Sequence, residues 1–181
     1  MALLWVWADA GDDFPDPMIS HSVGKGKDNE SSDVLLVQAL LNIFYTMYSR
    51  PPGLPNPPAP GSGWSDRTRA YVVEFQSKVV KQKKPTGVVS PPPPFMGWQT
   101  ALTKKFTVAK LIQSAGLALF QMQSEDNLVT FLKKQYPPLI VPFQTVRKGN
   151  TWTQPTGGTS EDFKSGGTTV EGVSTPQFYR N

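Results

Sequence analysis

The chain has 181 residues, of which 38% are hydrophobic, and it carries a formal net charge of +4 with no cysteine and one histidine. This length suits one ordinary domain with extensions rather than two large domains. The composition excludes a disulfide framework, a thiolate metal site, a cysteine–histidine catalytic pair and a zinc site with several histidines, and no stretch has the ~20 apolar residues of a membrane span.

The N-terminal residues 1–19 are predicted to be an extended segment. Residues 1–8 read MALLWVWA, a pattern that predicts a short strand covered on both faces. Trp5 and Trp7 would be costly to expose, so we expect them to be anchored on the domain or on a partner. The segment has no basic leader and runs into aspartates, so we expect no conventional signal peptide and synthesis in the cytoplasm.

The first helix is predicted over residues 33–48, with Ser31 and Ser32 as candidate N-caps. A proline-rich stretch over 51–60 follows and cannot be helical, because proline removes a backbone donor and restricts the residue before it. We expect a stiff loop on the surface there.

The second helix is predicted to begin within the stretch Trp64 to Gln76, WSDRTRAYVVEFQ. Ser65 is the candidate N-cap, and Asp66 in the first turn suits the helix dipole. Apolar residues then recur at helical spacing, so the two helices are expected to pack together. Across the chain, the residues assigned to the core are Val34, Val37, Leu41, Val72, Phe75, Val79 and Trp98.

Three further helices are predicted over about 97–105, 108–122 and 125–136, with Ser124 as the cap of the last one. The last two are expected to form a helical hairpin over residues 106–138. Residues 139–146 are β-prone, and Pro142 restricts such a strand to the edge of a sheet or to the sheet of a partner.

The remaining residues, 139–181, are predicted to form an extended C-terminal arm. Beyond Val146 the composition is rich in Gly, Thr and Ser and cannot bury a core of its own. We expect its aromatic residues to be anchors on neighbouring subunits of an assembly, as are Trp5 and Trp7. These C-terminal anchors are Trp152, Phe163, Phe178 and Tyr179.

The charge is unevenly distributed. Lys and Arg minus Asp and Glu is 3 − 7 = −4 over residues 1–64, 9 − 2 = +7 over 65–110 and 6 − 5 = +1 over the rest. A basic middle could face an anionic polymer such as cell wall or nucleic acid. A solvated helix face followed by a basic loop explains it equally well.

A set of short motifs, taken in order, carries a family resemblance. The motifs are Ser22-Val23-Gly24, Asp33-Val34, Val37-Gln38, Leu40-Leu41-Asn42, Thr68, Val72, Phe75-Gln76, Gly87-Val88-Val89, Trp98 and Leu102. Together they resemble the small three-helix peptidoglycan-binding domain over roughly residues 20–105. The chain departs from that pattern at Gly61, Ser62 and Ser65, and by having Tyr71 where a small residue is usual.

The resemblance implies a three-helix peptidoglycan-binding-like domain over residues 20–105. With the additional C-terminal helices and the extended N- and C-terminal arms read from the residues above, the expected fold is mainly α. The resemblance also implies a module that holds wall glycan or stem peptides without cutting them. The residues near the second helix that we assign to glycan binding are Trp64, Arg67, Arg69, Tyr71 and Gln76.

We therefore expect a non-catalytic structural protein of an assembly that contacts the bacterial cell wall, such as a phage virion or tail or a contractile injection or secretion apparatus. Its expected partners are other subunits and peptidoglycan, without nucleic acid, metal or cofactor. One alternative is a purely structural adaptor that binds no glycan. Another is the targeting subunit of a wall hydrolase.

Catalysis is not expected. His21 stands between Ser20 and Ser22, but no nucleophile-elbow motif supports a Ser-His-Asp arrangement. Paired carboxylates of the glycosidase kind are harder to exclude, because any two acids can approach in space. The acids nevertheless cluster in the N-terminal loop, where nothing indicates an apolar cleft.

Overall fold

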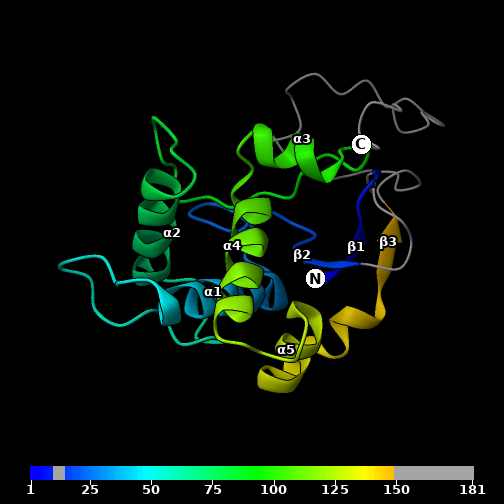
Figure 1. The fold of residues 1–181 in the computed structure, drawn as a ribbon. Helices are drawn as coiled ribbons and strands as arrows, with labels where there is room; N and C mark the ends of the chain where they lie inside the picture. Colours follow the sequence, from blue (N-terminus) through cyan, green and yellow to red (C-terminus); the bar gives the residue numbers. More distant parts are fainter. Residues whose placement is uncertain (10–14, 149–181) are drawn as a thin grey trace.

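The computed structural model describes residues 1–9 and 15–148, and nearly all of their buried apolar side chains form one cluster. Five α-helices dominate this part, which confirms the expectation of a mainly helical chain (Figure 1). The helices are α1 (Ser31–Met47), α2 (Asp66–Lys78), α3 (Trp98–Thr103), α4 (Thr107–Gln121) and α5 (Leu128–Gln135). The shorter elements are 3-10 turns η1 (Pro137–Leu139) and η2 (Pro142–Gln144) and strands β1 (Leu3–Val6), β2 (Asp16–Met18) and β3 (Val146–Lys148).

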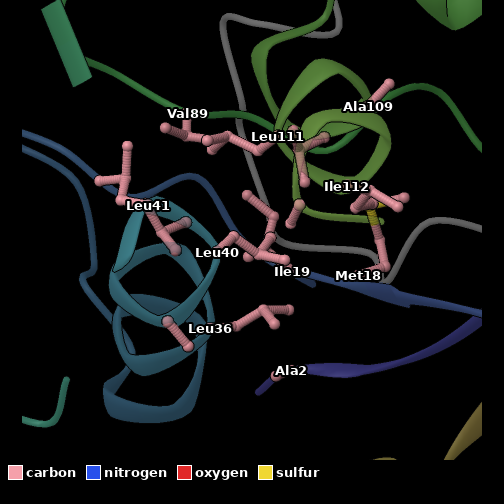
Figure 2. Close-up of a cluster of buried hydrophobic side chains, with 14 of the residues drawn as sticks. Ala2, Met18, Ile19, Leu36, Leu40, Leu41, Val89, Ala109, Leu111 and Ile112 are labelled. Atoms are coloured by element: carbon pink, nitrogen blue, oxygen red, sulfur yellow. The ribbon is translucent and has the colours of Figure 1, made fainter. Parts of the chain in front are cut away.

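Helix α1 is the centre of the molecule and packs most extensively against α4. Every residue from Ser32 to Leu41 is buried, so the helix is covered on all sides rather than along one stripe. Figure 2 shows Leu40 of α1 and Ile112 of α4 in the same apolar cluster as Ile19. Burying one such side chain stabilises the fold by roughly 2 kcal/mol relative to leaving it exposed.

Helix α2 also packs on α1, as predicted, through aromatic rings. Phe44 meets Phe75 edge to face with ring centroids 5.2 Å apart, and Tyr45 meets Tyr71 in the same way at 5.0 Å. The face that α2 turns toward α1 is therefore aromatic.

The three strands form one sheet in the order β2-β1-β3. Strand β1 is antiparallel to β2, with Leu3 opposite Met18, and parallel to β3, with Leu4 opposite Val146. All four residues of β1 are buried, which confirms the predicted strand with both faces covered. Strand β3 lies at an edge as expected, but it begins after Pro142, because residues 137–144 form 3-10 turns instead.

Two of the predicted helix caps are wrong. The side chain of Glu30, rather than Ser31 or Ser32, caps α1 and accepts hydrogen bonds from the backbone N–H groups of Ser32 and Asp33. The Ser32 hydroxyl instead accepts a 2.7 Å hydrogen bond from the N–H of Ala2 and so links α1 to β1.

At α5 the cap is Asn127, which accepts from the Thr130 N–H at 2.8 Å, and not Ser124. The cap predicted for α2 is confirmed, since the Ser65 hydroxyl accepts from the Thr68 N–H at 3.2 Å.

Helix α3 is held by the N-terminal segment. Asp9 accepts a 2.8 Å hydrogen bond from the backbone N–H of Trp98, the first residue of the helix. Gly97 leaves room for this carboxylate, because a Cβ atom at that position would lie 2.5 Å from Asp9 Oδ2. Sequence reasoning missed this cap, which comes from 89 residues away.

Most of the predicted core residues are buried. Val79 and Trp98 are half-buried and pack against the cluster. The helices α4 and α5 belong to the same cluster, with α4 on α1 and α5 against η1 and β2, so they do not pack only on each other. The fully confirmed core positions are Val34, Val37, Leu41, Val72 and Phe75.

Candidate glycan-binding surface

The predicted glycan-binding residues lie on and around α2, but the structure divides them into two groups. Arg67 and Arg69 are exposed and Trp64 is half-buried against the core, so these three remain accessible. Tyr71 and Gln76 are buried, with 0% and 1% of their surface exposed. The structure therefore contradicts the assignment of the last two to ligand contact.

Tyr71 lies beneath the proline-rich loop between α1 and α2. Its hydroxyl donates a 2.5 Å hydrogen bond to the carbonyl oxygen of Pro55, which ties the loop to the helix. Burial raises the pKa of this hydroxyl, and the charges of Arg50 and Arg67 oppose that rise. Arg67 lies one turn before Tyr71 on α2, and Arg50 donates to Asn56, next to the Pro55 carbonyl that accepts from this hydroxyl.

Arg50 is the residue of this surface that sequence reasoning missed. It is exposed and donates through Nη1 to the side-chain oxygen of Asn56 in the same loop. No local pattern marks it, because Arg50 and Arg67 are 17 positions apart and only the folding of the proline-rich loop over Tyr71 places both near its hydroxyl. We call Arg50, Arg67 and Trp64 the α2-start surface.

Gln76 has a structural role on α2. Its side-chain oxygen accepts from the backbone N–H groups of Thr86 and Gly87, at 3.0 and 2.8 Å. Its side-chain nitrogen donates to the carbonyl of Val88 at 2.7 Å and to the Thr107 hydroxyl at 3.0 Å. The amide is therefore fully used in joining α2, the following loop and α4, and no donor remains for a ligand.

Gln38 has the matching role on α1. It is fully buried, and its amide bonds to the 61–63 turn and to Thr68 of α2. Both glutamines of the resemblance motif thus fix loops to helices, and neither is positioned to bind a ligand.

The aliphatic part of the Arg69 side chain packs against the backbone of Gly87. Gly87 has φ 72°, and a Cβ atom there would lie 2.8 Å from Arg69 Cγ. The aliphatic stem of the arginine therefore packs on the glycine, while the residue as a whole remains exposed. Arg69 lies along α2 toward the 86–88 loop, so it faces away from the α2-start surface.

His21 lies in a hydrogen-bonded cluster with Ser20 and Asp33. The hydroxyl of Ser20 is 2.7 Å from His21 Nδ1, and Asp33 Oδ2 is 3.7 Å from the same nitrogen. A catalytic triad places serine and aspartate on different ring nitrogens, so this geometry does not match one. Asp33 also accepts from the backbone N–H groups of Ser20 and His21, both at 3.1 Å, and it fixes the loop that enters α1.

Asp33 is fully buried, and this burial raises the pKa of its carboxyl group. Over the described residues there is no group of three or more His, Cys, Asp or Glu side chains placed to hold a metal ion. Within residues 1–9 and 15–148, no helix combines the length and apolar character that a bilayer crossing requires.

Two of the predicted partner anchors are instead part of this chain's own core. Trp5 and Trp7 are 3% and 2% exposed, and Trp7 contacts Trp98. Trp5 belongs to β1, which is paired on both sides, and Trp7 follows this strand directly. The other predicted anchors lie outside the described residues: Trp152, Phe163, Phe178 and Tyr179.

Comparison with known proteins identifies no relative: no family model, curated protein or solved structure matches the chain.

Proposed function

We propose that this chain is a non-catalytic, peptidoglycan-binding-like component of a larger assembly that contacts the bacterial cell wall, and that it holds the wall through the α2-start surface. The observation that carries the proposal is the placement of two exposed guanidinium groups beside Tyr71. Arg50 donates to Asn56, next to the Pro55 carbonyl that accepts from the Tyr71 hydroxyl, and Arg67 lies one turn before Tyr71 on α2. This placement requires the fold, because Arg50 precedes the proline-rich loop and Arg67 follows it.

The chemistry of the surface suits wall peptides. A guanidinium group presents a planar fork of donors that matches a carboxylate in a bidentate manner. Peptidoglycan stem peptides carry free carboxylates, and sugars stack on aromatic faces such as the indole of Trp64. Two arginines for the peptide carboxylates and one indole for the sugar therefore offer both halves of a glycopeptide site.

The interior of α2 supports this site rather than forming it. Tyr71 and Gln76 hold the loops before and after the helix, so the arginines are displayed on a rigid element. Rigid display lowers the entropy lost when a ligand binds. The two buried residues are thus structural supports of the proposed site.

A purely structural adaptor is the second candidate, and a different observation favours it. Phe120 and Leu117 on α4 are 81% and 52% exposed, which is unusual for large apolar side chains three positions apart on one helix. Such side chains suit contact with a neighbouring subunit. An adaptor would use this face and have no need of the α2-start surface.

Co-sedimentation with insoluble peptidoglycan tests the proposal. The full chain should pellet with the wall at both low and high salt, and Arg67→Ala should lose at least tenfold in affinity. Arg67→Lys keeps the charge but loses the fork, so it should rescue only part of the binding. Lys25→Ala is the matched control, because Lys25 is exposed in a loop outside the α2-start surface.

Two outcomes would contradict the proposal. Wild-type protein that does not pellet would leave the adaptor as the better account. Pelleting that Arg67→Ala and Arg50→Ala leave unchanged would place the binding elsewhere on the chain.

A further inference from the structure

Six exposed lysines lie around two turns of the chain. Lys78, Lys81, Lys83 and Lys84 stand at the end of α2 and in the loop after it, and Lys104 and Lys105 form the turn between α3 and α4. We call these six residues the lysine cluster. In Figure 1 the loop after α2 and the end of α3 both lie toward the upper side of the view.

Specific hydrogen bonds join the two turns. The ammonium group of Lys105 donates to the carbonyl oxygen of Lys81 at 3.3 Å, and the side-chain amide of Gln82 donates to the carbonyl oxygen of Lys105 at 3.4 Å. The same Gln82 nitrogen lies 3.4 Å from the hydroxyl of Thr107, which Gln76 also contacts. The cluster is therefore built by the tertiary structure.

The backbone is strained at Lys81 and at Lys105, where the two turns meet. Lys81 has φ 59° and Lys105 has φ 62°, in the left-handed region. Glycine or asparagine is the usual residue at such positions just beyond a helix, and other side chains cost free energy there. Two lysines occupy these positions and contact each other, and strain of this kind clusters at functional sites.

The positive charge of the cluster is not neutralised within the described chain. Within residues 1–9 and 15–148, no ion pair involves a cluster lysine. The C-terminal ends of α2 and α3 contribute a negative charge of at most about half a unit each. Six ammonium groups therefore leave a strong local excess of positive charge.

We propose that the lysine cluster binds a linear polymer with repeating phosphodiester groups, of the polyol-phosphate kind found in bacterial walls. The cluster contains lysine alone, and lysine binds phosphate as a point charge on a flexible stem, without the fixed planar geometry of a guanidinium group. Several such charges side by side suit a flexible polymer whose phosphates repeat along its length. None of the residues from 78 to 84 is aromatic, so the stacking platforms that single-stranded nucleic acid uses are missing from that loop.

This surface is separate from the α2-start surface. The 13 residues of α2 span about 20 Å, and the two surfaces lie at opposite ends of the helix. The lysine cluster and the α2-start surface share no residue. Polymer binding by the first and peptidoglycan binding by the second can therefore be tested separately.

Fluorescence anisotropy with a labelled, lipid-free poly(glycerol phosphate) tests the inference on the full chain. The tested variant carries Lys81→Gln, Lys83→Gln, Lys84→Gln and Lys105→Gln, and the control is Arg67→Ala. We expect the variant to bind at least tenfold more weakly at 50 mM salt, with a shallower dependence of log affinity on log salt, because fewer counterions are released. Arg67→Ala should bind as wild type does.

A thermal unfolding measurement serves as the control that the variant is folded. Removal of like charges favours the fold at low salt and loss of the Lys105 hydrogen bond opposes it, so the unfolding temperature of the variant should stay close to that of the wild type. Equal affinity of wild type and variant for the polymer would overturn the inference. Equal binding of polyglutamate would reduce it to general charge attraction, and tighter binding of an oligothymidine would assign the surface to nucleic acid instead.

Discussion

The indole rings of Trp7 and Trp98 meet edge to face, with their centroids 5.0 Å apart, and join the residue directly after β1 to the start of α3. Trp7 also donates from Nε1 to Asp16 Oδ2 at 2.8 Å. One residue thus connects the first strand, the second strand and the third helix. The N-terminal segment is consequently part of the core that supports α3.

Trp7→Phe should destabilise the chain by about 1–3 kcal/mol, because a buried hydrogen bond to a carboxylate is lost together with part of the packing. Urea unfolding followed by circular dichroism measures this. Trp98→Phe is the control. Because Trp98 is half-buried, this substitution should lower the free energy of unfolding by less than Trp7→Phe does. Equal losses would show that the hydrogen bond of Trp7 contributes little.

The free energy of unfolding of the wild type should fall as pH rises through the mildly acidic range, and Asp16 is one cause of this fall. Burial raises the pKa of its carboxyl above the ordinary 3.8, although the hydrogen bond from Trp7 opposes the shift. Between the two pKa values the folded chain holds a proton that the unfolded chain releases, so stability falls as pH increases.

Asp16→Asn removes this charge but keeps an oxygen that can accept from Trp7. The variant should therefore be at least as stable as wild type at pH 7, with a weaker decline of stability from pH 4 upward. Urea midpoints at several pH values measure this. If the urea midpoints of the two proteins changed with pH in parallel, Asp16 would not be a source of the pH dependence.

Gln76→Ala should destabilise the chain by about 3 kcal/mol or more. The substitution leaves the N–H groups of Thr86 and Gly87 and the carbonyl of Val88 without their partner, and each such group costs roughly 1–3 kcal/mol when buried. Equilibrium unfolding in urea gives the value, and Gln99→Ala on exposed α3 surface is the control. A loss under 1 kcal/mol would mean that water replaces the amide.

Gly97→Ala and Asp9→Ala should each cost about 0.5–2 kcal/mol, which is the range for loss of a helix cap. The alanine Cβ would displace the carboxylate that caps α3, so both changes remove the same contact. The double variant should therefore lose much less than the sum of the two. Additive losses in a double-mutant cycle would show that the two residues act independently.

Local signals in the sequence were enough to predict several elements. Ser65 precedes a run with helical spacing and does cap α2, and the apolar residues 1–8 do contain a buried strand. Both depend on residues close together in the chain. The partners of β1 could not be predicted in this way, because β3 lies some 140 positions away.

Tertiary contacts also explain the incorrect assignments. Ser32 has the residue type of a helix cap, but its hydroxyl accepts from Ala2, and Glu30 caps α1 instead. Gln76 is assigned above to glycan binding, but the structure buries it. Its spacing of four from Val72 and three from Val79 places it on the apolar face, and that signal was present in the sequence.

The wall-contacting role depends most directly on where a peptidoglycan fragment binds. An amide and arginine side-chain NMR titration of the full chain with a soluble disaccharide-peptide fragment would locate the contact. The account predicts shifts at Arg50, Asn56, Trp64 and Arg67 that saturate together and leave the lysine cluster unchanged. Absence of shifts, or shifts confined to the lysine cluster, would contradict it.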